Sequence, residues 1–170
     1  GNIGSAAPLK LDMTRVKAYR DFNAVLNNPD IDLVDLCVPT PQHAPLAIAA
    51  LKAGKHVICE KPLARTAAIC RDIVKAVRKA KTFFMPAMVV RFWPEWAYAK
   101  DLIEQRTLGK VLAARFRRVS SPPGWSKGSY FKGADSGGAL LDLHIHDTDF
   151  VQFCFGRPRS VFSVGSTRFS

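Results

Sequence analysis

The sequence contains few cysteines and no long apolar run. No uncharged apolar stretch approaches the roughly 20 residues that a helix needs to cross a bilayer, and no leader of basic and then apolar residues opens the chain. We therefore expect no membrane partner. We also expect a cytoplasmic location, with the periplasm as the alternative because a leader would be lost from a chain whose amino terminus is cut. The cysteines form no CxxC pair and are irregularly spaced, which indicates buried free thiols rather than a disulfide framework; they are Cys37, Cys59, Cys70 and Cys154.

The sequence also lacks a concentrated basic tract, although its net charge is +11. A charge of that size can indicate a nucleic-acid or anionic partner. Here the basic residues are scattered, and the largest helical group fits the solvated face of a helix; it comprises Lys75, Arg78, Lys79 and Lys81. We therefore predict no nucleic-acid partner. With 170 residues, 48% of them hydrophobic, the chain has enough apolar material for a core.

The first half of the chain alternates between helical and strand patterns, which predicts crossover units on a parallel sheet. Apolar runs bounded by turn residues predict strands at 33–38, 56–59 and 83–90, and the first of these reads as buried on both faces. Helical periodicity predicts helices at 21–26 and 42–53 and a third that follows Thr66, a plausible N-cap.

The second half has a different pattern, with a helix at 95–106 and an alternating strand at 111–120 that is typical of a half-exposed antiparallel sheet. A loop at 120–138, an apolar helix at 139–155 and a strand at 160–168 follow. We predict two domains, residues 1–90 and residues 91–170. The chain begins with Gly1 and ends on a strand without a following partner, so we expect both ends to be cut.

Two strand ends carry candidate binding residues, because ligands of open parallel sheets bind beyond the carboxyl ends of the strands. Pro39, Thr40 and Pro41 follow the first strand, where the Thr40 hydroxyl and free amides can hold a ribose or a phosphate. Glu60 and Lys61 follow the next strand, and the lysine can direct its charge at a developing alkoxide or carbonyl oxygen. A plain turn and a surface salt pair are the alternative readings.

The stretch GGALLDLHIHDTDF at residues 137–150 is the most informative about catalysis, because it places ionisable side chains among apolar ones. On one helix, Asp142 and His146 lie four residues apart and share a face. Such ionisable groups are costly to bury in an apolar helix, which predicts that they line a cavity, with His146 able to take a proton near neutral pH. For His144 we expect a packed or capping role. A metal site using Asp142, His146 and Asp149, or using His144 and His146, is an alternative. No HExxH-type spacing supports either arrangement, and we predict no metal.

Three blocks of sequence resemble one family, the Gfo/Idh/MocA oxidoreductases, named after glucose-fructose oxidoreductase, inositol dehydrogenase and a rhizopine-catabolism protein. The blocks are IDLVDLCVPTPQHAPLAIAALKAGKHVICEKPLART at 31–66, VVRFWPEW at 89–96 and SGGALLDLHIHDTDF at 136–150. The resemblance implies an α/β chain with a partial Rossmann-type parallel sheet, followed by an α+β domain with an open, mainly antiparallel sheet. It also implies oxidation of a secondary hydroxyl of a sugar or cyclitol, or reduction of the matching ketone, with NAD or NADP.

Carried over by position, the resemblance makes Lys61, Asp142 and His146 the catalytic group, with His146 as acid/base and Asp142 orienting substrate or assisting His146. It places Pro39, Thr40, Pro41, His43, Glu60, Lys61 and Arg91 at the cofactor. The chain departs from the family because no GxGxxG follows an early strand, so we expect it to bind dinucleotide weakly by itself.

Three further expectations concern partners and alternative functions. An open sheet favours a homo-oligomer in the full-length protein. A catalytically silent dinucleotide-binding homologue is one alternative to the dehydrogenase. A metal-dependent sugar isomerase or hydrolase is the other.

Overall fold

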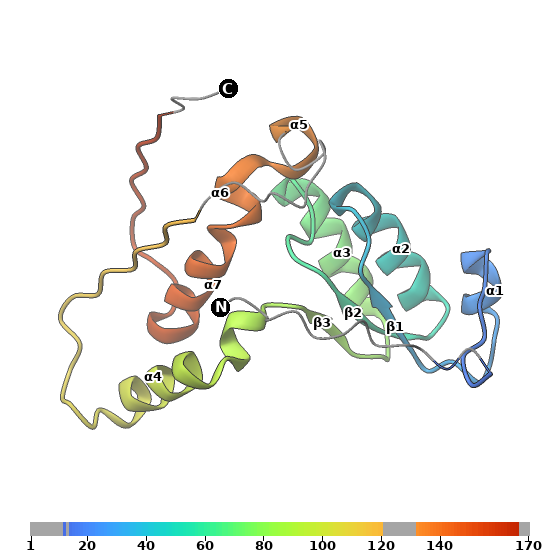
Figure 1. Ribbon diagram of the computed structural model, residues 1–170, viewed down its shortest axis with the longest axis horizontal. Helices are drawn as coiled ribbons and strands as arrows, with labels where there is room; N and C mark the ends of the chain where they lie inside the picture. Colours follow the sequence, from blue (N-terminus) through green and yellow to red (C-terminus); the bar gives the residue numbers. More distant parts are fainter. Residues whose placement is uncertain (1–11, 13, 121–131, 167–170) are drawn as a thin grey trace.

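The computed structural model describes residues 12, 14–120 and 132–166, and its first half is a parallel sheet with crossover helices (Figure 1). The three strands pair in the order β1-β2-β3, and both pairs are parallel. Their bounds are Leu33–Leu36 for β1, His56–Cys59 for β2 and Phe84–Pro86 for β3. This arrangement confirms the predicted crossover units of a Rossmann-type sheet.

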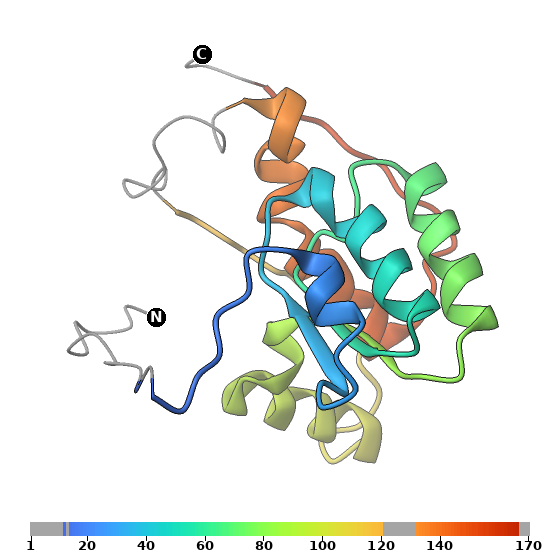
Figure 2. The same cartoon turned by 90° about the vertical axis from the view of Figure 1, so that its right-hand side faces the viewer.

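Helices connect the strands and provide the core. The helices of this half are α1 at Phe22–Leu26, α2 at Thr40–Lys52 and α3 at Ala67–Lys79. Helices α2 and α3 lie side by side, and α2 packs against β1 and β2 (Figure 2). The buried core residues come from α2 and the first two strands; they are Val34, Leu36, Ala47, Ala50, Leu51, Val57 and Cys59.

Local signals determine where these elements begin. Asp21 caps α1 by accepting a hydrogen bond from the amide of Asn23 at 3.0 Å, and Thr66 caps α3 by accepting from the amide of Ile69 at 3.3 Å. Pro41 lies in the first turn of α2, where its missing N–H costs no helical hydrogen bond. The predicted Thr66 cap is therefore confirmed, and strand β2 also has its predicted bounds.

Burial of the sheet differs from the prediction. Strand β1 ends at Leu36, and only Val34 and Leu36 are buried, while Leu33 and Asp35 on the opposite face are exposed. The prediction of burial on both faces is wrong for the described residues, because the core helices pack on the face that carries Val34 and Leu36. Strand β3 is also shorter than predicted, and residues 89–92 form a 3-10 helix, η1 at Val89–Phe92.

The second half is mainly helical, with α4 at Pro94–Gln105, α5 at Gly133–Ser136, α6 at Gly138–Asp142 and α7 at Ile145–Phe155. Aromatic rings join α4, the segment 111–120 and α7. Phe150 is 1% exposed and meets Trp96 edge to face at 4.7 Å between ring centroids, and Phe116 at 6.2 Å. These contacts hold the extended segment against the helices.

Neither predicted strand of this half is assigned within the described residues. Residues 111–120 and 160–166 run as extended chain without strand pairing (Figure 1), and 167–168 lie outside the described residues. An extended segment becomes a strand only when a neighbour takes its backbone hydrogen bonds. The predicted alternation is present only over residues 115–119, where Phe116 and Arg118 are partly buried between exposed neighbours; residues 111–114 are all exposed. Most of the predicted loop, residues 121–131, is also outside the described residues.

Candidate active site

The loops that follow β1 and β2 meet at one edge of the sheet, and His43 joins them. Its imidazole is 1% exposed; Nδ1 lies 2.8 Å from the Pro62 carbonyl oxygen and Nε2 lies 2.7 Å from the Val38 carbonyl oxygen. Helix α2 brings this histidine inward from its first turn. His43 therefore braces the two candidate binding loops with its side chain.

Lys61 connects this edge to the second half of the chain. Its ammonium donates to Asp142 Oδ1 at 2.9 Å and to the Asp142 carbonyl oxygen at 2.8 Å. The two side chains are 17% and 23% exposed, so the pair is mostly withdrawn from solvent. The backbone amide of Lys61 in turn bonds Glu60 Oε2 at 3.1 Å. Two residues predicted to act together are thus in direct contact although 81 positions apart.

The single helix predicted for 139–155 is wrong, because the structure breaks it at Leu143 and His144 between α6 and α7. In a continuous helix the Asp142 carbonyl would accept the amide of His146. That amide instead points at the Leu143 carbonyl at 3.4 Å, while Lys61 occupies the Asp142 carbonyl. A cation at a helix C-terminus is favourable, so Lys61 both ends α6 and pairs with its last residue.

His146 opens α7 beside this pair. Its imidazole is partly buried, and Nδ1 is fully buried without a hydrogen-bond partner among the described residues. Burial lowers the pKa of His146 below its ordinary value, and the positive charges of Lys61 and Arg118 lower it further. Lys61, which the family resemblance groups with His146, is thus close enough to affect the pKa of the imidazole. At neutral pH His146 is therefore an uncharged imidazole, the form that can accept a proton.

Each aspartate in residues 146–149, whose sequence is HDTD, pairs with a cation from a different segment. Arg118 holds Asp147 through two bonds of 2.7 Å, and Arg91 of η1 holds Asp149 through bonds of 2.7 and 2.6 Å. The two-bond geometry to Arg118 lowers the pKa of Asp147, and the Asp149 carboxylate raises the pKa of Arg91.

The aspartates 142, 147 and 149 are thus all charge-compensated, and no cluster of metal-ligating side chains is present in the described ranges.

His144 does not pack in the core. Its side chain is 55% exposed and makes no capping bond to the backbone of α7; its Nδ1 lies 3.2 Å from Asp147 Oδ2. His144 stands at the N-cap position of α7, which agrees with the capping alternative. The packing alternative is wrong, because the break in the helix turns this side chain outward.

The structure brings some predicted site residues together and leaves others apart. Lys61 and Asp142 touch, and His146 lies within their electrostatic reach. Pro39, Thr40 and Pro41 stand at the start of α2, where Pro39 at the N-cap makes no side-chain bond to the helix amides. The guanidinium of Arg91 is engaged by Asp149 and lies 4.5 Å from the Phe153 ring centroid.

Sequence reasoning missed Arg118 and Asp147. Two features of the sequence could have indicated them. Asp147 is adjacent to His146, and Arg118 lies at an alternating position of its segment that faces inward.

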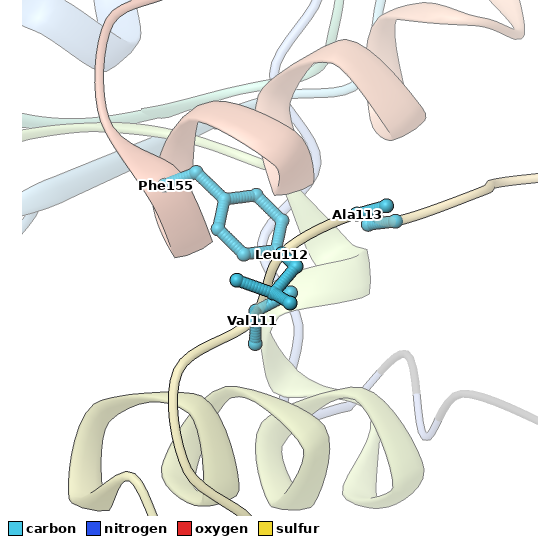
Figure 3. Close-up of a pocket in the computed structure, with 5 residues that line it drawn as sticks. Val111, Leu112, Ala113 and Phe155 are labelled. Atoms are coloured by element: carbon cyan, nitrogen blue, oxygen red, sulfur yellow. The ribbon is translucent and has the colours of Figure 1, made fainter.

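A pocket of about 170 Å³ lies elsewhere, lined by residues 111–114 and Phe155 (Figure 3). The side chains of its lining residues are all apolar and none is a predicted site residue, so the pocket has no acid or base for chemistry. No helix in the described part of the chain combines the length and apolar character of a membrane span.

The parallel sheet and its crossover helices define a Rossmann-type domain, and Lys61 pairs with Asp142 beyond the end of strand β2. Residues 4–88 match the family model described as "Oxidoreductase family, NAD-binding Rossmann fold", and residues 96–170 match the Gfo/Idh/MocA C-terminal domain. The chain belongs to the Gfo/Idh/MocA oxidoreductase family.

Named relatives share about a third of its residues. Levoglucosan dehydrogenase of Pseudarthrobacter phenanthrenivorans is 36% identical over 154 residues, which are 86% of this chain and 39% of that protein. Myo-inositol 2-dehydrogenase of Thermotoga maritima is 35% identical over 153 residues, which are 88% of this chain and 44% of that protein.

A solved structure of levoglucosan dehydrogenase with NADH and levoglucosan aligns with a TM-score of 0.71 at 35% identity, over 81% of this chain and 38% of that one. The chain thus spans about two fifths of the length of these relatives.

Proposed function

We propose that the whole protein is an NAD(P)-dependent oxidoreductase that transfers a hydride between the nicotinamide and a secondary hydroxyl or ketone of a sugar or cyclitol. The observation that carries the proposal is the contact of Lys61 with Asp142 beside the neutral His146. The names of the relatives, a levoglucosan dehydrogenase and a myo-inositol dehydrogenase, support the substrate class.

In this proposal Lys61 stabilises charge on the reacting oxygen. Its ammonium is held by Asp142 at 2.9 Å, so its position is set before substrate arrives. Asp142 has the complementary role of orienting Lys61 and the substrate hydroxyl. A preorganised cation costs no reorganisation when the oxygen becomes negative during oxidation.

His146 takes the hydroxyl proton during oxidation and returns it during reduction. Its lowered pKa keeps it in the accepting form at neutral pH, and protonation adds a charge that Asp142 and Asp147 stabilise. The proton therefore moves to a side chain while the two electrons leave with the hydride. Substrate oxygen, Lys61 and His146 must meet at one point for this step.

The residues at the edge of the sheet fit a dinucleotide. The first turn of α2 has no side-chain cap, and the Gln42 amide already donates to the Pro39 carbonyl at 2.8 Å. The amide and the hydroxyl of Thr40 are therefore the groups here that can bind ribose or phosphate oxygens. Glu60 and Lys61 would face the nicotinamide end, with Pro39, Pro41 and His43 shaping the wall and Arg91 nearby. When bound, NAD or NADP accepts or supplies the hydride.

The remaining placements are also proposals. We infer a cofactor domain over residues 1–90 and the beginning of a substrate domain over residues 91–170. We also infer a homo-oligomer and a cytoplasmic location, which four free cysteines support because reduced thiols persist there.

The test is turnover by the purified whole protein with NAD and NADP over a panel of sugars and cyclitols deuterated at the reacting carbon. Deuteride transfer to the nicotinamide is expected, and His146→Asn is expected to abolish it while dinucleotide binding persists. His144→Asn is the matched control, since that histidine is exposed two residues away.

Nicotinamide fluorescence changes without turnover on any substrate would overturn the proposal in favour of a silent binding homologue. Activity that is lost on chelation and restored by metal would favour the metal-dependent alternative.

A further inference from the structure

A second charged pair lies next to the proposed base. Asp147 follows His146 in the first turn of α7 and is 4% exposed, and its carboxylate oxygens accept two bonds from Arg118 at 2.7 Å. We propose that Arg118, acting through Asp147, is a positioning residue for His146, an inference that rests on the proposed function.

The geometry supports this role because the segment 111–120 contacts one face of α7 at two points. Phe116 and Arg118 are two positions apart in extended chain and therefore point the same way. Phe116 packs on Phe150 and Arg118 bonds Asp147, which are three residues apart on α7 and so are neighbours on its surface. Two such contacts restrict rotation of α7 about its axis, and this rotation determines where the imidazole of His146 points.

Arginine suits this position better than lysine would. Its planar guanidinium binds both oxygens of a carboxylate at once, which sets the orientation of the carboxylate as well as its distance. The Asp147 side chain is 6% exposed and that of Arg118 is 26% exposed, so water weakens the pair less than it weakens a surface salt bridge.

The pair also balances charge around His146. Lys61 from the loop after β2 and Arg118 from the extended segment lower the pKa of the imidazole, while Asp142 of α6 and Asp147 of α7 raise it. Among the other charged groups on elements packed against α7, Arg91 of η1 pairs with Asp149 and Lys100 of α4 pairs with Glu104. Helix α4 also carries Glu95 and Asp101, and His144 faces Asp147. Arg118 and Asp147 change the pKa of His146 in opposite directions. Loss of either residue alone is therefore expected to shift this pKa.

The experiment removes one charge at a time from the whole protein and follows the His146 imidazole by NMR titration, with His146→Asn identifying its signal. Arg118→Met leaves the Asp147 carboxylate unopposed, so the titration midpoint is expected to rise. Asp147→Asn leaves the Arg118 cation unopposed, so the midpoint is expected to fall. The double variant is expected to return close to the parent.

Kinetics give the second readout. On the acid side of the kcat/KM profile for oxidation, Arg118→Met is expected to lose about threefold at fixed pH, the effect of roughly 0.7 kcal/mol expected for a partly exposed charge. Arg118→Lys is expected to restore the midpoint but not the full kcat. Arg117→Met is the matched control, because it removes the same charge from an exposed neighbour on the other face.

Shifts in the same direction, or no shifts, in the folded variants would overturn the positioning role. If Arg118→Met does not fold, Asp147→Asn must still lower the midpoint and Arg118→Lys must leave it near the parent, or the inference fails. The NMR titration needs no turnover, so opposite shifts would support the pair even if no sugar were oxidised. Opposite shifts without a matching kinetic change would instead count against His146 as the base.

Discussion

Replacement of Lys61 by methionine isolates the ammonium group, because methionine keeps much of the apolar stem. The change removes two hydrogen bonds to Asp142, of 2.8 Å to its carbonyl and 2.9 Å to its carboxylate, and leaves that carboxylate 23% exposed without a partner. It also frees the carbonyl that ends α6. The same atoms therefore contribute to folding and to the proposed chemistry.

The two effects have different sizes. A hydrogen bond to a charged group contributes about 1.5–3 kcal/mol, and the remaining solvent access reduces it here, so we expect a loss of about 2 kcal/mol in the free energy of unfolding. Removal of one preorganised group that stabilises transition-state charge costs about 100- to 1000-fold in turnover. The expected outcome is a modestly destabilised protein with little activity.

Urea unfolding measures the first effect, and steady-state formation of reduced nicotinamide measures the second. Lys75→Met is the matched control, since Lys75 also lies 2.9 Å from a carboxylate, that of Asp72, but the two side chains are 71% and 59% exposed. The control should change stability by less than about 0.5 kcal/mol and leave turnover intact. Turnover of Lys61→Met within threefold of the parent would refute the catalytic role, and a stability loss no larger than the control's would refute the bridging role.

Three further changes test packing, backbone and protonation. Phe150→Ala should cost about 3–5 kcal/mol of unfolding free energy by calorimetry, because this ring is 1% exposed among other aromatic rings; a cost below 1 kcal/mol would contradict the packing. Gly137→Ala should destabilise more than Gly138→Ala, because both have positive φ but a Cβ at Gly137 would lie 2.5 Å from Leu141 Cδ2; equal urea midpoints would contradict the clash.

His146 has a lowered folded pKa, so the unfolded chain takes up its proton first; its stabilisation is present above about pH 6.5 and is lost as pH falls toward the folded pKa. His146→Gln should therefore flatten the pH dependence of stability below that pH, and an unchanged slope would refute the assignment.

The elements predicted most accurately are those whose signals are local. Strand β2 has its predicted bounds, and Thr66 caps α3 as expected, because an apolar run between turn residues and a hydroxyl before a helix act within a few residues. The order of strands and helices was sufficient to predict a parallel sheet, since parallel neighbours need crossover connections. The contact between Lys61 and Asp142 followed from the family resemblance, because no local pattern links residues 81 positions apart.

The errors occur where the local structure depends on groups that are distant in the sequence. Periodicity favoured an unbroken helix over residues 139–155, but the ammonium of Lys61 takes the carbonyl that the helix would use. His144 stands at the N-cap position of α7, but the packing expected as its alternative is absent, because that break turns its side chain outward. Residues 111–120 have the alternation of a strand but lack a described strand partner.

The alternating elements, the family and the residue types able to move a proton can be predicted from the sequence, because these depend on neighbours in the chain. The pairing of cations with aspartates became known from the folded chain: Lys61 meets Asp142, Arg91 meets Asp149 and Arg118 meets Asp147. An ion pair depends on distance and burial in space, and the same basic residue is a solvated charge until folding brings a carboxylate within reach.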